Sequence, residues 1–189
     1  MSAALFYRQG AAATSIRDIA KACGLTPGAL YKHFASKDDL LFTIVEHGHR
    51  ALEERIEAEL AFAPGGAAEQ LAAFVRAYVL GHLVHPQLAQ VVRREYLHLS
   101  EDRYRSTVQQ RRRTREQLGR LLATGQREGR FDLVGPTPTS VALMILDMCS
   151  RTSVWFDPTR TQRPELVAER YVRAALRLAG SAEPAQPES

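Results

Sequence analysis

Apolar residues recur at helical intervals over nearly the whole chain. Ile16, Ile19 and Cys23 lie three or four residues apart, so they share one face of a helix. Leu30 and Phe34 repeat this spacing after a short interruption. No segment of useful length alternates with the two-residue period of a β-strand. The pattern therefore predicts an all-α protein.

Glycine and proline divide the rest of the chain into longer helices. The clearest break is the Pro-Gly-Gly segment at residues 64–66, and Pro86 marks another. The predicted helices beyond residue 35 cover residues 36–62, 67–85, 87–99, 101–128, 139–156 and 163–179. The tail, residues 180–189, is rich in Pro, Glu, Ala and Ser, and this composition predicts disorder.

Local signals between residues 15 and 27 predict two short helices joined by a tight turn. Ser15 and Asp18 have the spacing of a capping box, in which each side chain accepts a hydrogen bond from the other residue's backbone amide. Gly24 suits the left-handed position that ends a helix. Thr26 is a favourable N-cap, and Pro27 is favourable as the first helical residue. Two helices joined in this way form a helix-turn-helix unit.

The charge of this N-terminal segment favours a DNA duplex as its partner. The whole chain is only mildly basic, with a formal net charge of +4 and a pI of about 9.3. The basic character is concentrated instead in residues 1–34, where the single acid is Asp18 and the basic residues are Arg8, Arg17, Lys21 and Lys32. A basic face over a small apolar core is the electrostatic footprint of a nucleic-acid-binding unit.

The sequence lacks the motifs of the common enzyme classes. It contains no Walker loop, dinucleotide-binding glycine motif, nucleophile elbow, metal-ligand spacing or pair of catalytic carboxylates, so we expect no catalytic residue, metal or cofactor. Cys23 and Cys149 fall on apolar faces without metal-ligand neighbours, which favours reduced thiols over a disulfide. Because no long apolar run or leader segment is present, we expect a soluble cytoplasmic protein without a membrane partner.

The N-terminal motif resembles the signature of the TetR family of transcriptional regulators. The matching residues are Thr14-Ser15-Ile16, Ile19-Ala20, Gly24-Leu25-Thr26, Leu30-Tyr31, Phe34 and Lys37. The close match covers about residues 5–45. The resemblance implies nine helices in two domains. These are a three-helix, helix-turn-helix DNA-binding domain at residues 1–46 and a helical effector-binding and dimerisation domain at residues 47–179, connected by a fourth helix from about residue 37.

The sequence departs from the family pattern at its N-terminus. Family members usually have a longer first helix, often preceded by a basic arm, before the segment that matches Leu5-Phe6. Only residues 1–4 precede that segment here. Either the first helix is shortened, which would weaken DNA binding, or the natural start lies upstream of Met1.

The second helix of the helix-turn-helix unit is expected to enter the major groove with its N-terminal end leading. Small residues at that end allow close approach to base edges and thymine methyl groups. The resemblance implies phosphate contacts for Tyr31 and Lys37, and for His33 simple solvent exposure competes with base contact. The predicted DNA-binding residues are Arg17, Thr26, Pro27, Gly28, Ala29, Tyr31, Lys32, His33 and Lys37.

The C-terminal region is longer than dimerisation alone requires, and the resemblance implies a ligand cavity among its helices. Arg151 and Trp155 are four residues apart, which would place a guanidinium beside an indole on one helical face. Such a pair suits an anionic ligand with a flat or apolar body. An acyl-CoA thioester fits, because family members that control lipid or steroid breakdown often respond to one. The competing interpretation is an Arg–Trp stack that packs the core. The predicted effector residues are Phe74, Tyr78, His82, Tyr96, Met144, Met148, Arg151 and Trp155.

A homodimer is expected, because one helix-turn-helix unit contacts too few phosphates for specific binding. A symmetric dimer reads two half-sites about 34 Å, or a multiple of that distance, apart. The helices at residues 139–156 and 163–179 are predicted to form a four-helix bundle with a second copy. The alternative is that they close only the core of one chain. The predicted interface residues are Val141, Ile145, Leu166, Val172, Leu176 and Leu178.

Arginines are concentrated between residues 63 and 135, which contain twelve Arg and no Lys against seven acids. Glu101 with Arg105, and Glu116 with Arg120, have the four-residue spacing of helical ion pairs. Consecutive arginines point around a helix, so a solvated face is favoured over one anionic partner such as the phosphates of CoA.

Two functions from different classes fit these observations. The first is a ligand-responsive DNA-binding regulator, most simply a repressor that leaves a palindromic operator when a small-molecule effector binds. The second is a small-molecule-binding helical protein or an enzyme whose N-terminal helices are structural. Because the DNA-binding signature is dense and enzyme motifs are missing, the sequence favours the first.

Overall fold

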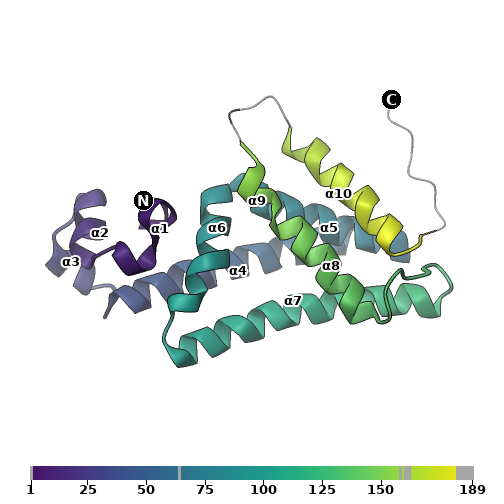
Figure 1. The fold of residues 1–189 in the computed structure, drawn as a ribbon, viewed down its shortest axis with the longest axis horizontal. Coiled ribbons are helices and arrows are strands. Elements are labelled where there is room, and N and C mark those ends of the chain that lie inside the picture. The colour runs from purple at the N-terminus through teal and green to yellow at the C-terminus, as the bar shows by residue number, and fades with distance from the viewer. Residues whose placement is uncertain (1, 64, 158, 160–162, 182–189) are drawn as a thin grey trace. The chain divides into compact units, whose positions relative to one another are not determined.

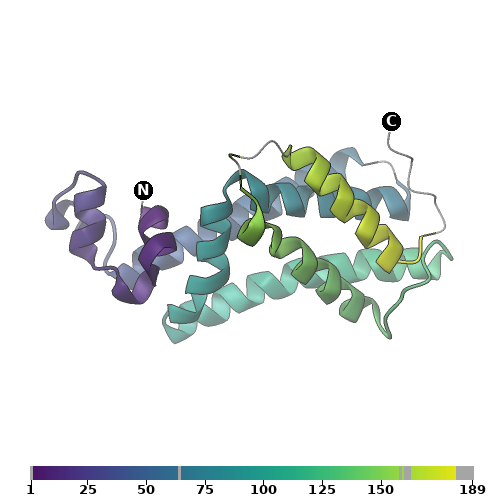
Figure 2. The ribbon, with the colours of Figure 1, turned by 45° about the horizontal axis from the view of Figure 1, so that its top comes forward.

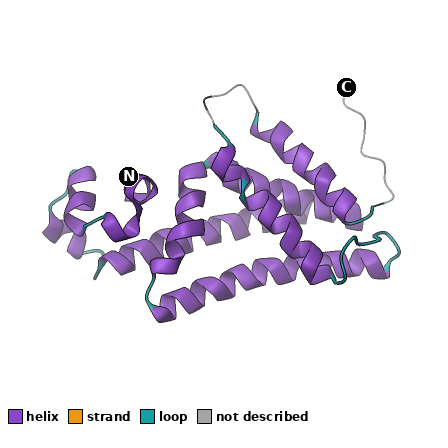
Figure 3. Cartoon of the chain, in the orientation of Figure 1, coloured by secondary structure: helices purple, strands orange, loops and turns teal. Residues whose placement is uncertain are grey.

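The structure, a computed structural model, describes residues 2–63, 65–157, 159 and 163–181. Every regular element within these ranges is a helix (Figure 3), which confirms the predicted all-α class. The helices are α1 (Ser2–Ala13), α2 (Ile16–Ala22), α3 (Pro27–Tyr31), α4 (Lys37–Phe62), α5 (Ala67–Val84), α6 (Pro86–Glu95), the 3-10 helix η1 (Tyr96–His98), α7 (Glu101–Arg127), α8 (Pro138–Ser150), α9 (Thr152–Trp155) and α10 (Pro164–Leu178).

The described residues contain ten α-helices instead of the nine expected, because one predicted helix is broken. The prediction of a single helix over residues 139–156 is wrong, because α8 ends at Ser150 and α9 begins at Thr152. The Thr152 hydroxyl donates to the carbonyl of Cys149 at 2.7 Å, and the Ser153 hydroxyl donates to that of Ser150 at 3.0 Å. Hydroxyls that bond to nearby carbonyls in this way compete with regular helix geometry.

The chain forms two compact units, and neither is continuous in sequence. Unit 1 comprises residues 1–51 and 85–111, and unit 2 comprises residues 52–84 and 112–189. Helix α4 therefore runs through the predicted boundary at residue 46, and α6 belongs with the DNA-binding helices although it follows α5. The sequence domains 1–46 and 47–179 stay predictions.

Unit 1 encloses a small core beneath the helix-turn-helix. Its buried apolar residues are Phe6, Ala11, Ile19, Ala20, Leu30, Leu40, Leu41, Val45, Val91, Val92 and Leu99. Helices α4 and α6 approach each other closely at Gly48, where an added Cβ would lie only 2.6 Å from Cγ2 of Val92. Any other residue at this position would force the Val92 side chain to move.

Unit 2 is built around α5, α8 and α10, which lie side by side in both views (Figures 1 and 2). Its core includes Phe74 and Val75 from α5, Ile145 from α8 and Val172 from α10. An ion pair between Arg76 Nε of α5 and Glu169 Oε1 of α10, 2.5 Å long, adds a polar link between two of these helices. Hydrogen bonding to Glu169 raises the pKa of Arg76, so this guanidinium stays charged.

The segment after α7 is held against the end of α10. Phe131 is buried in the core of unit 2, and the amide of Val134 donates to the carbonyl of Leu178 at 3.2 Å. Gly180, with φ +61°, ends the helix where a side chain would collide with the carbonyl of Asp132. The first two residues of the predicted disordered tail, 180 and 181, thus belong to this ordered end; residues 182–189 lie outside the described residues.

Three further observations concern membrane-spanning helices, metal-binding groups and the two cysteines. None of the helices in the described ranges is both long and apolar enough to cross a bilayer. Among the same residues, no three His, Cys, Asp or Glu side chains gather into a group that could hold a metal ion. Cys23 and Cys149 are free thiols, and burial raises the pKa of Cys149 well above its usual range.

Candidate DNA-binding surface and effector region

The predicted capping box is present at the start of α2. Oγ of Ser15 accepts from the amide of Asp18 at 3.1 Å, and Oδ2 of Asp18 accepts from the amide of Ser15 at 2.9 Å. The hydrogen bonds from the Ser15 hydroxyl and amide lower the pKa of the Asp18 carboxyl. Its negative charge also lies at the positive end of the α2 dipole. These interactions fix where α2 begins.

The turn between α2 and α3 also has the predicted geometry. Gly24 has φ +69°, and the amide of Leu25 donates back to the carbonyl of Ala20 at 2.9 Å. Thr26 then caps α3, because its hydroxyl oxygen accepts from the amide of Ala29 at 3.2 Å. Pro27 is the first residue of α3. The helix-turn-helix unit predicted from the sequence is therefore confirmed.

Helix α3 presents its predicted recognition residues to solvent. Leu30 is buried, which turns the opposite side of α3 outward, and Tyr31 is 55% exposed. Helices α2 and α3 lie next to each other near the purple end of the ribbon (Figure 1). Ala29 is half-buried, and the remaining exposed members of the predicted set are Arg17, Thr26, Pro27, Gly28, Lys32 and His33. Their contacts with DNA stay predictions.

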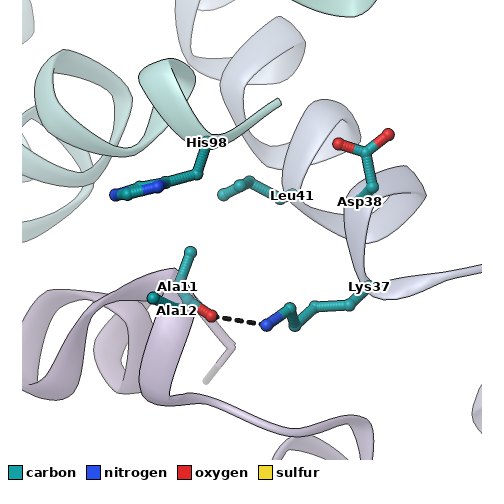
Figure 4. Close-up of a pocket in the computed structure, with 6 residues that line it drawn as sticks. All are labelled: Ala11, Ala12, Lys37, Asp38, Leu41 and His98. Atoms are coloured by element: carbon teal, nitrogen blue, oxygen red, sulfur yellow. Dashed lines mark hydrogen bonds between the residues drawn. The ribbon is translucent and has the colours of Figure 1, made fainter. Parts of the chain in front are cut away.

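Lys37 is placed differently from the other predicted DNA contacts. Its side chain is half-buried, and its ammonium donates a hydrogen bond to the carbonyl of Ala11 at 2.7 Å (Figure 4). Lys37 lines a pocket of about 210 Å³ together with Ala11, Ala12, Asp38, Leu41 and His98. The ammonium thus links the start of α4 to the end of α1, and its phosphate contact stays a prediction.

The start of α4 is also held by an arginine that sequence analysis missed. Arg103 of α7 pairs with Asp38 through Nη1 at 2.9 Å and with Asp39 through Nη2 at 2.5 Å. The same guanidinium lies 5.3 Å from the ring centre of Phe42. Arg103 is more than sixty residues away in sequence from both acids, so no local pattern marks the contact. Ser36 and Asp39 form only half of a capping box, because the Asp39 amide donates to Oγ of Ser36 at 3.0 Å while Asp39 Oδ2 accepts from the amide of Ala35.

Three predicted effector residues of α5 lie in one aromatic row in unit 2. The rings of Phe74 and Tyr78 are stacked at 6.2 Å between centres, and those of Tyr78 and His82 lie 4.5 Å apart. Nδ1 of His82 donates to the carbonyl of Tyr78 at 2.8 Å. Phe74 and His82 are buried, and Tyr78 is half-buried.

Four other predicted effector residues lie on α8, on α9 or between these two helices. Arg151 and Trp155 do not lie on one continuous helix, because the break between α8 and α9 falls at Arg151. Trp155 is 49% exposed and stacks on Tyr171 with 6.5 Å between ring centres. Arg151 and Met144 are exposed, and Met148 is half-buried. The continuous helix expected to carry this pair is therefore wrong, while the effector role of Arg151 and Trp155 stays a prediction.

Tyr96 belongs to unit 1, apart from the seven other predicted effector residues. Its ring stacks on that of Tyr104 with 5.8 Å between centres. The guanidinium of Arg111 lies 4.9 Å from the same ring. Its observed partners are therefore those of a packed surface cluster in unit 1.

Half of the predicted interface residues are buried inside the chain. Val141, Ile145 and Val172 have exposed fractions of 0%, 1% and 4%, so they form the core of unit 2 and cannot face a second copy. This part of the prediction is wrong. Leu166 is 54% exposed, while Leu176 and Leu178 are half-buried. Leu143 and Met144, which sequence analysis did not assign to an interface, are exposed on α8.

The ion pairs of α7 join residues four positions apart, as predicted, but one of them has a different partner from the predicted one. Arg105 pairs with Glu101 at 2.8 Å, as predicted. Glu116 pairs with Arg112, at 2.6 Å, instead of Arg120. All four paired side chains are exposed, consistent with a solvated face.

The fold and the exposed end of α3 define a helix-turn-helix regulator that carries a second helical unit. Residues 2–44 match the family model described as bacterial regulatory proteins, tetR family. Residues 64–179 match the model described as the tetracyclin repressor-like C-terminal domain. The chain belongs to the TetR family of transcriptional regulators. This is a family of regulators and not of enzymes.

Two solved structures illustrate how far the fold is shared. A TetR-family bacterial regulatory protein from Rhodococcus RHA1 is 31% identical, with a TM-score of 0.88 over 96% of this chain and 94% of that one. The structure of AibR in complex with isovaleryl coenzyme A and operator DNA has a TM-score of 0.80 over 95% of this chain and 94% of that one. AibR is only 23% identical, so this second likeness shows the fold alone.

Curated relatives match over short stretches of the chain. The transcriptional repressor KstR2 of Mycobacterium tuberculosis is 46% identical over 41 residues, which are 22% of this chain and 20% of that protein. The uncharacterised regulator YerO of Bacillus subtilis is 49% identical over 43 residues, 23% of this chain. The chain spans only 15% of the length of YerO and 20% of that of KstR2.

Proposed function

We propose that this protein is a ligand-responsive repressor that binds a palindromic DNA operator as a homodimer. The observation that carries the proposal is the capped α2–α3 unit, whose leading end is exposed and flanked in sequence by the exposed cations Arg17, Lys21 and Lys32. In helix-turn-helix proteins this end of the second helix contacts base edges in the major groove. The flanking cations are suited to the phosphates on either side.

Roles within the surface follow from chemistry and exposure. Thr26, Lys32 and His33 carry hydrogen-bonding groups that suit base edges, and Pro27 and Ala29 offer apolar contact to thymine methyl groups. Tyr31 and Arg17 are exposed and carry donors that suit phosphate oxygens. The Lys37 ammonium donates one of its three protons to the Ala11 carbonyl, which leaves two donors for a phosphate oxygen.

A second copy of the chain is the partner that supplies the other half-site. The corrected candidate surface consists of the exposed apolar residues of α8 and α10, which are Leu143, Met144 and Leu166. Exposed leucines on two neighbouring helices favour a four-helix contact between two copies. The buried residues Val141, Ile145 and Val172 support this surface from within.

The proposed effector is an acyl-CoA thioester. The aromatic row on α5 offers an apolar wall in unit 2, and the arginine-rich α7 offers cations that suit phosphate groups. AibR, which shares the fold, was solved with isovaleryl coenzyme A and operator DNA. The effector would favour a dimer state whose half-site spacing no longer fits the operator, so that the protein leaves the DNA.

Binding to the DNA upstream of the protein's own gene tests the DNA-binding role. Fluorescence anisotropy across a salt series should give tight, salt-sensitive binding to one palindromic fragment. Lys32→Ala should lower the slope of log affinity against log salt by about one if this side chain binds a phosphate, whereas loss of preference at one base pair would assign it to base readout. Arg127→Ala, an exposed cation of unit 2, is the control and should leave both unchanged. Equal, weak binding to all fragments would contradict the repressor.

A panel of CoA thioesters tests the effector separately. An active thioester should raise the melting temperature of the free protein and weaken its affinity for the palindrome, with free CoA and the matching fatty acid as controls. If no thioester changes either quantity, the acyl-CoA proposal is wrong while the DNA-binding role stands.

A further inference from the structure

Helix α1 is interrupted at Gly10. This residue has φ +79° and ψ 160°, a combination that essentially only glycine adopts. Ala11, the next residue, is buried. Buried backbone groups need hydrogen-bond partners, and at a helix break those partners must come from elsewhere in the protein.

Two charged side chains from two other helices hold the backbone of Ala11. Oε2 of Glu95, the last residue of α6, accepts a hydrogen bond from the Ala11 amide at 2.8 Å. The ammonium of Lys37, the first residue of α4, donates to the Ala11 carbonyl at 2.7 Å (Figure 4). We call Glu95, Lys37 and the Ala11 peptide groups the Ala11 clamp. Through it, one residue of α1 is bonded to both α4 and α6.

Glu95 is an unusual residue for its position. It is only 5% exposed, on the side of α6 that otherwise buries Val91 and Val92. Burying a carboxylate is costly unless hydrogen bonds and opposite charges compensate. Nη2 of Arg94 lies 3.8 Å and Nε2 of His98 lies 4.0 Å from its carboxylate oxygens, and both distances are longer than hydrogen bonds. The short bond to Ala11 is therefore the main polar interaction that this acid makes.

The clamp lies directly before the helix-turn-helix. The Thr14 hydroxyl donates to the carbonyl of Gly10 at 2.6 Å, and Ser15 follows as the N-cap of α2. Residues 10–14 therefore set the direction in which the chain enters α2. On the other side, α6 follows α5 after the single residue His85, and α5 carries the aromatic row of the proposed effector region.

We propose that Glu95 is a positioning residue that couples α6 to the recognition unit through the Ala11 clamp. A shift of α6 would move the Ala11 amide and with it the start of α2, which changes where α3 is presented. Glu95 cannot act as a DNA contact, because it is buried and carries the same charge as phosphate. The inference rests on the proposed repressor function, since its expected effect is a change in the half-site spacing that the protein prefers.

The test compares the full-length wild type with three variants on two DNA fragments, the palindrome and a copy with one base pair inserted between its half-sites. In Glu95→Ala, affinity for the palindrome should fall about tenfold, the usual effect of removing one partner of a charged hydrogen bond. The preference for the palindrome over the inserted copy should shrink as well, because α3 is held less firmly. A loss of folded protein alone would lower both affinities equally and leave that preference unchanged, which would overturn the proposal.

Two further variants complete the test: one separates the hydrogen bond from the charge, and the other is a control. Glu95→Gln keeps an oxygen that can accept from the Ala11 amide, so its spacing preference should lie close to that of the wild type. A glutamine variant as impaired as the alanine variant would overturn the hydrogen-bond assignment. Glu101→Ala removes an exposed carboxylate from the same unit and should behave as the wild type.

Amide hydrogen exchange tests the clamp without DNA. Exchange of the peptide containing residues 11–15 should accelerate severalfold in Glu95→Ala and not in Glu95→Gln or Glu101→Ala. This result would stand even if the wild-type protein bound no palindrome, in which case the repressor function fails and the clamp does not. Unchanged exchange together with an unchanged spacing preference, in a protein that binds its palindrome, overturns the clamp alone.

Discussion

Three residues determine the ends of the helix-turn-helix helices, and each acts through a different property. Ser15 and Thr26 supply side-chain oxygens that accept amide hydrogen bonds, whereas Gly24 supplies a φ of +69°. Each property belongs to the residue type and acts on neighbours within four or five positions. For that reason the start, turn and restart of this unit could be predicted from sequence alone.

Ser15→Ala should weaken the fold in a pH-dependent way. It removes the acceptor for the Asp18 amide, and we expect a loss of about 1 kcal/mol in the free energy of unfolding at neutral pH. The folded-state pKa of Asp18 lies below its usual value of 3.8 because of hydrogen bonds from Ser15. The stabilisation from that charge is therefore present above the unfolded-state pKa and is lost as pH falls through the folded-state value.

Urea unfolding at neutral and strongly acidic pH checks this prediction. The difference between wild type and Ser15→Ala should shrink in acid, and an NMR titration of the variant should find the pKa of Asp18 moved back toward its usual value. The same difference at both pH values would show that the carboxylate contributes nothing through its charge.

Gly10→Ala should destabilise the protein through backbone strain alone. An added Cβ would meet only the Glu95 carboxylate oxygens, at 3.9 and 4.0 Å, which are ordinary contacts. Its φ of +79° is nevertheless unfavourable for alanine, and such strain costs about 1–3 kcal/mol. Thermal and urea unfolding measure the loss. Gly119→Ala in α7 has similar contact distances and no positive φ, so it should be neutral or stabilising.

At the level of helices, the contacts that hold the DNA-binding unit come from segments distant in sequence. Arg103 of α7 ties down the first turn of α4, and Glu95 of α6 does the same for the end of α1. Hydrophobic periodicity reveals which face of a helix is buried, but it does not name the partner. This is why the helices were predictable and why Glu95 and Arg103 were not.

Arg103→Ala should loosen α4 from α7. It removes two charged hydrogen bonds to partly buried aspartates, and we expect a loss of about 1.5–3 kcal/mol in unfolding free energy. Arg105→Ala is the matched control, because its pair with Glu101 is exposed on the same helix and is worth about 0.3–0.5 kcal/mol. Urea unfolding in low and high salt distinguishes the two. Equal losses in both variants would mean that Arg103 contributes no more than a surface pair.

The error at α8 and α10 has the same physical origin. Val141, Ile145 and Val172 have the spacing of a buried face, and that face is indeed buried, but inside their own chain. A helix that packs in a core and also contacts a partner chain needs two apolar sides. In α8 and α10 the side with the more regular apolar spacing faces the core of the same chain. The candidate surface for a second copy is therefore identified by which apolar side chains are exposed in the folded chain, and not by the spacing of apolar residues in the sequence.

At the scale of the whole molecule, regulation depends on how the chain connects its two compact units, each of which is made of two separate stretches of sequence. The chain passes from unit 1 to unit 2 within α4 and within α7, and it returns to unit 1 at His85. Three covalent connections therefore link the units. A change of state in unit 2 has three routes along the backbone to unit 1, and the Ala11 clamp lies on the route through α6.

Leu166→Glu tests the proposed dimer on which the proposed operator binding rests. Leu166 is exposed in the folded chain, so a charge there should change the unfolding free energy by no more than about 0.5 kcal/mol. Buried between two copies, however, two facing carboxylates would repel each other and prevent association. Sedimentation should then show a monomer, and affinity for the palindrome should fall about a hundredfold or more, because two linked binding units gain that much from acting together.

The control for this variant is Leu97→Glu, which places the same charge at a 61% exposed leucine of η1, outside α8 and α10. It should remain dimeric and bind as the wild type does. If Leu166→Glu also sediments as a dimer and keeps its affinity, the exposed apolar residues of α8 and α10 do not form the interface. A second copy would then have to meet another exposed apolar residue, such as Val134 or Phe62, and the half-site geometry would have to be derived again from that contact.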